Sequence, residues 1–313
     1  MNGAQLDISS FWHWLGQRFI VDFHIGAGFT AAVDYMTAHF AAFFDGVAAI
    51  IEFIAGNLIA FLNFLPAAVI FAVVILIALW RSGWKLALAV FIGLYLLMSM
   101  GFWGYSMDTL GLVIGATVVA LIVGLPLGVA MAKSEWTNTV VRPILDFMQT
   151  LPPFVYLIPA VIFFGTGRIP GTIATFIFCM PPAVRMMNLG IRHVPTENVE
   201  AGRAFGCNPL QLLFRVELPL AMPSIMAGIN QTIMLALSMV VIASLIGAGG
   251  LGNPVVTGLQ QLRLGIGFEG GLGVVILAIL LDRVTQSFAE RSSRAGGLAA
   301  RFLRVFSRRD AQV

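Results

Sequence analysis

The stretch EAGRAFGCNPLQLLFRVELP, residues 200–219, is the longest polar interruption in a chain that is otherwise largely apolar. Its centre holds Gly206, which can take a positive φ at little cost, and Asn208, which can cap the start of a helix. The proline after Asn208 suits the first turn of a helix, because its φ is fixed and it has no N–H to satisfy. We therefore expect a helix over residues 196–205, a tight bend, and a second helix over residues 209–216.

The rest of the chain has the composition of an integral membrane protein. It has 313 residues, of which 59% are hydrophobic and 11% charged, and its mean hydropathy is +0.93. In soluble domains about 25% of residues are charged. The two cysteines, Cys179 and Cys207, do not make a disulfide framework. The first residues lack a basic segment followed by an apolar core, so we expect no cleaved signal peptide.

The lengths of the uncharged apolar segments predict an all-α membrane protein with about seven transmembrane helices, because roughly 20 apolar residues cross a bilayer. The expected spans cover residues 66–80, 86–107, 109–132, 146–164, 169–184, 220–246 and 271–284. Between the last two spans, a cluster of glycines predicts a loop or a re-entrant segment: Gly247, Gly249, Gly250 and Gly252.

Three regions are expected along the chain: an N-terminal region over residues 1–64, a transmembrane domain over residues 65–289 and a basic tail over residues 290–313. In the first region, Asp45, Glu52 and Asn63 fall within about 20° of one another on a helical wheel. Such an amphipathic helix favours lying along the membrane surface. We expect the outer surface, because an acidic stripe is disfavoured by an anionic inner leaflet.

Basic residues predict the orientation. If the loop over residues 81–85 is cytoplasmic, 15 of the 18 lysines and arginines lie inside, and the exceptions are Arg18, Arg168 and Arg263. This asymmetry satisfies the positive-inside rule and places both the 200–219 stretch and the C-terminal tail in the cytoplasm. It also accounts for the sequence pI near 9.2 without nucleic-acid binding.

The 200–219 stretch resembles a signature of importer-type ABC permeases, which reads E-A-A, three residues, G, nine residues, I-x-L-P. The pattern falls on Glu200, Ala201, Gly202, Gly206, Val216, Leu218 and Pro219. Two positions depart from the signature, since Gly202 replaces its second alanine and Val216 replaces its isoleucine. The resemblance implies a coupling loop over residues 190–219, in which Arg203 and Asn208 also lie. In that family the loop docks on a separate ATPase and carries its motion into the membrane domain. A loop that merely joins two spans is the alternative.

Three further stretches resemble the glycine betaine/proline/choline branch of these permeases: QTLPPFVYLIPAVIFFGTG (149–167), PPAVRMMNLGIRHVP (181–195) and AGINQTIMLALSMVVIASLIGAGGLG (227–252). The resemblance covers about residues 65–265 and implies a five-helix permease core. It implies a bacterial inner-membrane importer of osmolytes built from two permease chains, two ATPases and a soluble or lipid-anchored binding protein. That binding protein is expected to make most of the choice between glycine betaine, proline betaine, choline, proline and carnitine.

The sequence shows no catalytic, nucleotide-binding or metal-binding motif. The only lysines, Lys85 and Lys133, end no phosphate-binding loop, and the four histidines have no metal-ligand spacing. We expect a chain without enzymatic activity or cofactor, with ATP and Mg²⁺ bound by the partner ATPase. Alternatives are a secondary transporter or channel, which would need intramembrane acids or bases, and a membrane scaffold or sensor.

Polar and proline residues inside the spans predict a translocation pathway: Gln149, Thr150, Pro152, Pro153, Phe154, Tyr156, Asn230 and Gln231. Two consecutive prolines must break a helix, and broken helices at membrane depth line cavities or pack inside protein. Carbonyls freed by the break could face the substrate, although a packing kink is equally compatible. Asn230 and Gln231 could instead join helices.

Two further expectations concern aromatic and proline residues of the spans. Phe154, Tyr156 and Trp103 could form an aromatic cage for a quaternary ammonium ion. The pair Pro181–Pro182 is expected to break its own span as Pro152–Pro153 does.

Overall fold

The computed structural model describes the backbone of residues 25–307 and, apart from residues 29, 32 and 82, the side chains of residues 28–286. The predictions for the first 24 residues and for the charges of the tail lie outside the described residues. The chain forms two compact units, Met1–Phe44 and Asp45–Val313. In the first unit the described residues form α2 (Ile25–His39) and the start of α3 (Ala41–Ile51).

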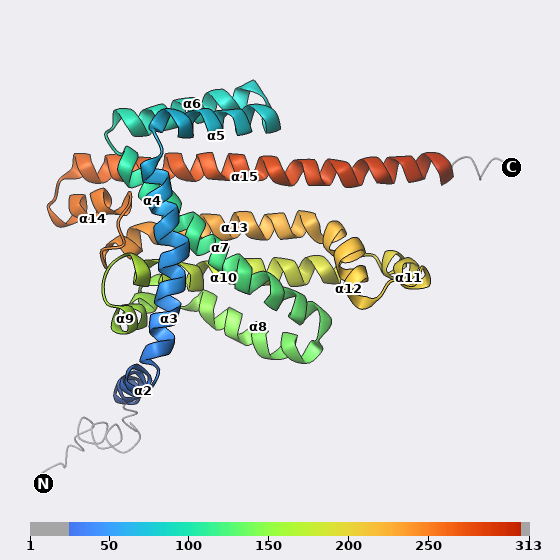
Figure 1. Cartoon of the computed structure of the whole chain (residues 1–313), viewed down its shortest axis with the longest axis horizontal. Coiled ribbons are helices and arrows are strands. Elements are labelled where there is room, and N and C mark those ends of the chain that lie inside the picture. The colour runs from blue at the N-terminus through green and yellow to red at the C-terminus, as the bar shows by residue number, and fades with distance from the viewer. Residues whose placement is uncertain (1–24, 308–313) are drawn as a thin grey trace, which may run out of the picture. The chain divides into compact units, whose positions relative to one another are not determined.

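The second unit is helical throughout its described part (Figure 1). After α3 its elements are η1 (Glu52–Gly56), α4 (Asn57–Phe64), α5 (Ala67–Ser82), α6 (Trp84–Ser99), α7 (Trp103–Lys133), α8 (Glu135–Thr150), α9 (Pro153–Phe164), α10 (Arg168–Arg192), α11 (Thr196–Ala204), α12 (Pro209–Leu212), η2 (Leu213–Glu217), α13 (Leu218–Ser244), α14 (Gly252–Gln260) and α15 (Leu264–Ser307). The segments η1 and η2 are π-helical turns inside longer helical runs.

Helix α10 forms the centre of this unit, packed against both α7 and α13. Glycines set the spacing on both sides. A Cβ at Gly128 of α7 would lie 2.6 Å from Met187 Cβ, and a Cβ at Gly228 of α13 would lie 2.7 Å from Met186 Cβ. Small residues let membrane helices approach closely and gain packing contacts. Gly128 and Gly228 therefore allow α7 and α13 to approach α10 closely.

Five helical runs among the described residues are long and apolar enough to cross a membrane, or six if α8 and α9 count as one bent span. The shorter apolar helices α5 and α6 have 16 residues each, about 24 Å, which is less than the ~30 Å hydrocarbon core. The all-α membrane fold is confirmed. The single span predicted over residues 86–107 is wrong, because Gly101 with φ +75° turns the chain between α6 and α7.

The break predicted at Pro181–Pro182 is also wrong. Helix α10 runs without interruption from Arg168 to Arg192, and both prolines are buried in it. Neighbouring helices can compensate the hydrogen bonds that a proline removes from a membrane helix. Here α7 and α13 flank α10, and this packing keeps the helix intact.

The helical run from Asp45 to Phe64 packs on α7. A Cβ at Gly111 would lie 2.4 Å from Ile59 Cγ1, and Asn63 Nδ2 donates to Asp108 Oδ1 at 2.8 Å. In Figure 1 this run lies steeply across the directions of α10, α13 and α15. Together with the first residues of α3 it forms the run Ala41–Phe64, which is long and apolar enough to cross a membrane, so its placement along the outer surface stays a prediction.

The glycine cluster after α13 makes a tight turn. Gly247, Gly249 and Gly250 take φ values of +84°, +90° and +73°, which L side chains rarely adopt. Helix α14 then folds back against α15, where Gly258 and Gly267 meet so closely that a Cβ at Gly258 would lie 2.4 Å from Gly267 Cα. The predicted loop is therefore present, and re-entry of this segment into the membrane stays a prediction.

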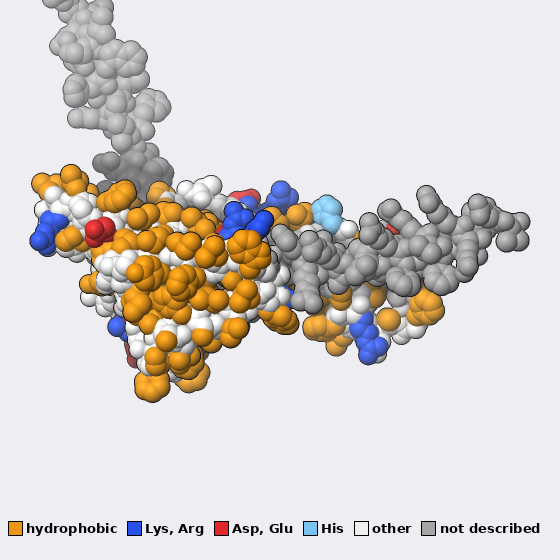
Figure 2. Space-filling view, turned by 90° about the horizontal axis from the view of Figure 1, so that it is seen from above, with side chains coloured by type: hydrophobic (Ala, Val, Ile, Leu, Met, Phe, Trp, Pro, Cys, Tyr) orange, Lys and Arg blue, Asp and Glu red, His pale blue; other side chains and the backbone are white. Residues whose placement is uncertain are grey.

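Hydrophobic side chains cover most of the described surface that Figure 2 shows, with a few charged side chains among them. Large exposed apolar residues on α5 and α6 include Leu76, Trp80, Trp84 and Tyr95. A contiguous apolar surface of this kind marks contact with lipid or with another protein.

Candidate functional site

Helices α11, α12 and the turn η2 form a projection at one end of the bundle, here called the knob (residues 196–217) (Figure 1). Its two arms meet at Gly206, whose φ is +80°. The Gln211 N–H donates to Asn208 Oδ1 at 2.8 Å, and the Asn208 N–H donates to Gln211 Oε1 at 3.0 Å. This reciprocal pair is a capping box. The predicted helix, glycine bend, cap and second helix are confirmed.

Gly202 fixes how the two arms pack. It is buried, and a Cβ there would lie 2.7 Å from Leu212 Cδ1 and 3.4 Å from Val216 Cγ2. The Leu212 side chain is buried in the space that the glycine leaves. The departure at Gly202 from the alanine of the signature therefore allows close contact between α11 and the second arm.

The outer face of the knob carries large apolar side chains without cover. Phe205, Leu210 and Phe214 are 90%, 67% and 64% exposed. Glu200, Ala201 and Arg203 are exposed beside them. Exposed aromatic and aliphatic side chains rimmed by charges are typical of a protein interaction surface.

Pro219 does not separate the knob from the membrane helix. The run from Pro209 to Ser244 is one helical path of 36 residues, with Leu218 and Pro219 in the first turn of α13. Pro219 has no N–H to donate to the preceding turn, and π-helical turns such as η2 accommodate local defects of this kind. The second arm of the knob is therefore continuous with α13.

Ion pairs hold the base of the knob, and sequence reasoning missed them. Lys133 Nζ donates to both carboxylate oxygens of Glu217, at 2.6 and 2.5 Å. Arg192 Nη1 donates to Glu135 Oε1 at 2.6 Å. The sequence does show that all four charged residues lie at the ends of long apolar runs. It does not show which of them pair with one another.

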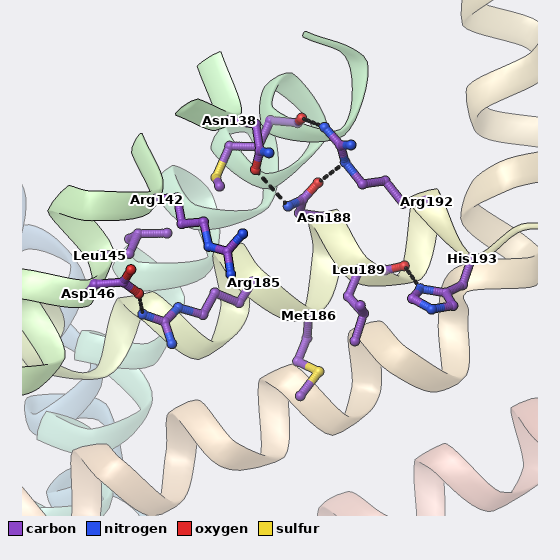
Figure 3. A pocket seen from close by; sticks show the side chains of 11 residues that line it. Asn138, Arg142, Leu145, Asp146, Arg185, Met186, Asn188, Leu189, Arg192 and His193 are labelled. Atoms are coloured by element: carbon purple, nitrogen blue, oxygen red, sulfur yellow. Dashed lines mark hydrogen bonds and ion pairs between the residues drawn. The ribbon is translucent and has the colours of Figure 1, made fainter. Parts of the chain in front are cut away.

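Beside this base, a cavity of about 490 Å³ lies between α8 and α10 (Figure 3). Its polar lining comprises Asn138, Arg142, Asp146, Arg185, Asn188, Arg192 and His193. Arg185 Nη2 pairs with Asp146 Oδ1 at 2.5 Å, and Asn188 Nδ2 donates to Asn138 Oδ1 at 3.3 Å. Within the described residues no group of three His, Cys, Asp or Glu side chains is placed to hold a metal ion.

The break predicted at Pro152–Pro153 is confirmed, since α8 and α9 are bent by 100° there. Gln149, Thr150, Pro152 and Phe154 are exposed at the bend and Pro153 is half-buried. The Tyr156 hydroxyl donates to the Met148 carbonyl, so this carbonyl is capped by the chain's own side chain.

The predicted aromatic cage is wrong. Tyr156 is buried and meets Phe178 edge-on at 6.1 Å, whereas Trp103 stacks on Phe71 at 5.5 Å. The two rings belong to different hydrophobic clusters. Trp103 starts α7 and packs toward α5, while Tyr156 packs toward α10.

The polar pair of α13 divides between two environments. Asn230 Nδ2 donates to Asp282 Oδ1 of α15 at 2.9 Å, and Thr285 Oγ1 donates to Asn230 Oδ1 at 2.7 Å. Asn230 thus joins two helices, which is a common role of polar side chains in membrane proteins. Gln231 is exposed.

The described residues thus form a multi-pass membrane protein with one bent span and an exposed apolar knob at one end of its helix bundle. A family model described as "Binding-protein-dependent transport system inner membrane component" matches residues 124–294. The chain belongs to this family.

Curated relatives agree with this assignment. The chain is 47% identical over 268 residues to the glycine betaine/proline betaine transport system permease protein ProW of Escherichia coli (strain K12), covering 86% of this chain and 75% of the relative. It is 44% identical to the glycine betaine transport system permease protein OpuAB of Bacillus subtilis (strain 168), covering 84% and 94%. A solved structure of the MetNI methionine ABC transporter in an inward-facing conformation matches with TM-score 0.55, at 21% identity, over 63% of this chain and 96% of that chain. This last likeness concerns the fold alone.

Family membership makes the chain a multi-pass inner-membrane permease subunit of a bacterial ABC importer. In such systems a separate ATPase hydrolyses ATP and a binding protein delivers the substrate. The secondary transporter, the channel and the membrane scaffold, considered on the sequence alone, are thereby set aside.

Proposed function

We propose that this chain is the membrane subunit of an importer of glycine betaine and proline betaine, compatible solutes taken up under osmotic stress. The observation that carries the proposal is the grading of identity among relatives. Permeases named for glycine betaine are 44–53% identical, whereas those named for trimethylamine N-oxide and choline are 38% and 33% identical. Carnitine and choline are secondary candidates.

The knob is the proposed docking element for the ATPase. Its exposed side chains Phe205, Leu210 and Phe214 offer apolar anchors, and such anchors near the centre of an interface supply most of the binding energy. Glu200 and Arg203 would form part of the polar rim. The continuous helix from Pro209 to Ser244 would carry displacement of the knob into the membrane.

The assembly we propose contains two copies of this chain and two ATPases, with the binding protein on the outer side. Each chain offers one knob, and one ATPase would dock on each. The positive-inside rule supports a cytoplasmic knob and tail: Lys133, Arg192 and Arg203 lie at the knob end of the bundle or on the knob itself.

The bend between α8 and α9 is the proposed part of the translocation pathway. Gln149, Thr150 and Phe154 are exposed there, and non-helical backbone at membrane depth occurs where it lines a cavity or is buried in protein. Asn230 is no longer proposed as a pathway residue, because its amide is hydrogen-bonded to α15.

Affinity purification of the tagged chain in mild detergent, followed by uptake assays in proteoliposomes, tests this function. A near-stoichiometric ATPase is expected, and Phe205→Ser with Phe214→Ser should release it. Leu76→Ser, on an exposed apolar position of α5, is the matched control. Labelled glycine betaine should enter only with ATP and the binding protein. A chain that purifies alone and moves solute without ATP would contradict the proposal.

A further inference from the structure

Both ends of the knob are tied to the same short corner of the membrane domain. Arg192 lies just before the knob and Glu217 is its last residue. Their partners, Glu135 and Lys133, flank Ser134, the single residue between α7 and α8. The Ser134 hydroxyl also accepts from the Thr137 N–H at 3.2 Å and caps α8.

On one side of the corner, the Arg192 guanidinium bridges two helices; Figure 3 shows its contact with Asn188. Its Nη2 donates to the Met131 carbonyl at 2.8 Å and its Nε donates to Asn188 Oδ1 at 2.9 Å, while Nη1 pairs with Glu135. The Met131 carbonyl belongs to the last turn of α7, where backbone acceptors lack helical partners. Arg192 therefore binds the end of α7 and the start of α8 at once.

On the other side, the Glu217 carboxylate is almost fully buried. Its side chain is 5% exposed, and that of Lys133 is 43% exposed. A buried carboxylate is costly unless it is paired. Lys133 also lies in the last turn of α7, where a cation interacts favourably with the helix dipole. The pair thus fixes the knob's second arm to the end of α7.

We propose that the Lys133–Glu217 and Glu135–Arg192 pairs form a second route of coupling, by which movement of the knob displaces α7 and α8 together with α13. The first route is the continuous helix from η2 into α13. The corner adds α8, which leads directly into the bend at Pro152–Pro153. This inference rests on the proposed function, because it assigns the four residues a positioning role in ATP-driven transport.

The test uses the reconstituted importer with its ATPase and binding protein. The variants are Lys133→Gln, Arg192→Gln and the exchange of charges K133E with E217K. The matched control is Lys85→Gln, which removes the charge of an exposed lysine on α6, outside the knob and the corner between α7 and α8. Three quantities are measured: ATPase retained on the permease, ATP hydrolysis stimulated by loaded binding protein, and solute transported per ATP.

We expect Lys133→Gln and Arg192→Gln to keep the ATPase bound while transport per ATP falls about fivefold or more, a typical size for coupling between sites. The exchange of charges should recover part of the loss, and the control should transport normally. The inference would be overturned if Lys133→Gln and Arg192→Gln transported as much solute per ATP as the unaltered permease. A loss in the control as large as that in the variants would also overturn it. If the charge-exchange variant K133E with E217K does not accumulate in the membrane, comparison of the two single variants with the control still tests the inference. If the unaltered permease fails to retain an ATPase, the proposed function itself is wrong.

Discussion

The Tyr156 hydroxyl caps the Met148 carbonyl, the acceptor that Pro152 leaves without a backbone donor. In an unbroken helix the N–H of residue 152 would bond to this carbonyl, and proline has no N–H. One side chain of α9 therefore closes the gap that the proline opens at the end of α8. The bend is fixed by a specific hydrogen bond as well as by the missing donor.

Replacing Tyr156 with Phe should loosen this bend. The half-buried Met148 carbonyl would lose its donor, and a typical intramolecular hydrogen bond contributes about 0.5–1.5 kcal/mol. We expect a lower midpoint of thermal unfolding in detergent and slower uptake. Tyr95→Phe, which removes a hydroxyl from an exposed ring on α6, should leave both values unchanged. An unchanged midpoint in Tyr156→Phe would show that the hydrogen bond does not stabilise the bend.

Gly206→Val should uncouple ATP hydrolysis from uptake while the chain still inserts in the membrane. Valine is strained at φ +80°, at a cost of about 1–3 kcal/mol, so the two arms of the knob would lose their relative position. Gly206→Asn is the matched variant, because asparagine tolerates the left-handed region better than other residues. Transport per ATP should be near normal in Gly206→Asn and low in Gly206→Val. Normal transport in the Val variant would rule out the bend as essential.

The knob could be predicted from the sequence because its determinants are local. The Gly206 turn, the Asn208 cap and the proline at the first helical position act within a few residues of one another. The same holds for the bend at Pro152–Pro153. Local chemistry of this kind can be read directly from the sequence.

The identical pair Pro181–Pro182 shows where such reading fails. Both prolines are buried in α10, and α7 and α13 pack along that helix, so tertiary contacts decide whether a double proline breaks the chain. The Lys133–Glu217 pair joins residues 84 positions apart, and no periodicity or motif links them. The aromatic cage failed for the same reason, because proximity in space was inferred from residue type alone.

Gly202→Ala should be tolerated and Gly202→Leu should not. The added Cβ would meet the end of the Leu212 side chain at 2.7 Å, which can rotate away, and alanine is the residue of the ABC permease signature. A leucine would force α11 away from the second arm, since overpacking a filled contact costs about 1–3 kcal/mol. Retention of the ATPase by each variant measures the effect. If Gly202→Leu retained as much ATPase as the unaltered chain, the packing of the two arms would not shape the docking surface.

Asn230→Ala should lower stability without changing the affinity for the transported solute. The substitution leaves Asp282 with Gln286, whose Nε2 donates to its carboxylate at 2.7 and 2.8 Å, and removes the link between α13 and α15. Such interhelical bonds are worth about 0.6 kcal/mol on average, so the shift in unfolding midpoint should be small but measurable. Gln231→Ala, at the exposed neighbouring position, should not shift it. A changed apparent affinity for glycine betaine in Asn230→Ala, with unchanged stability, would instead return Asn230 to the translocation pathway.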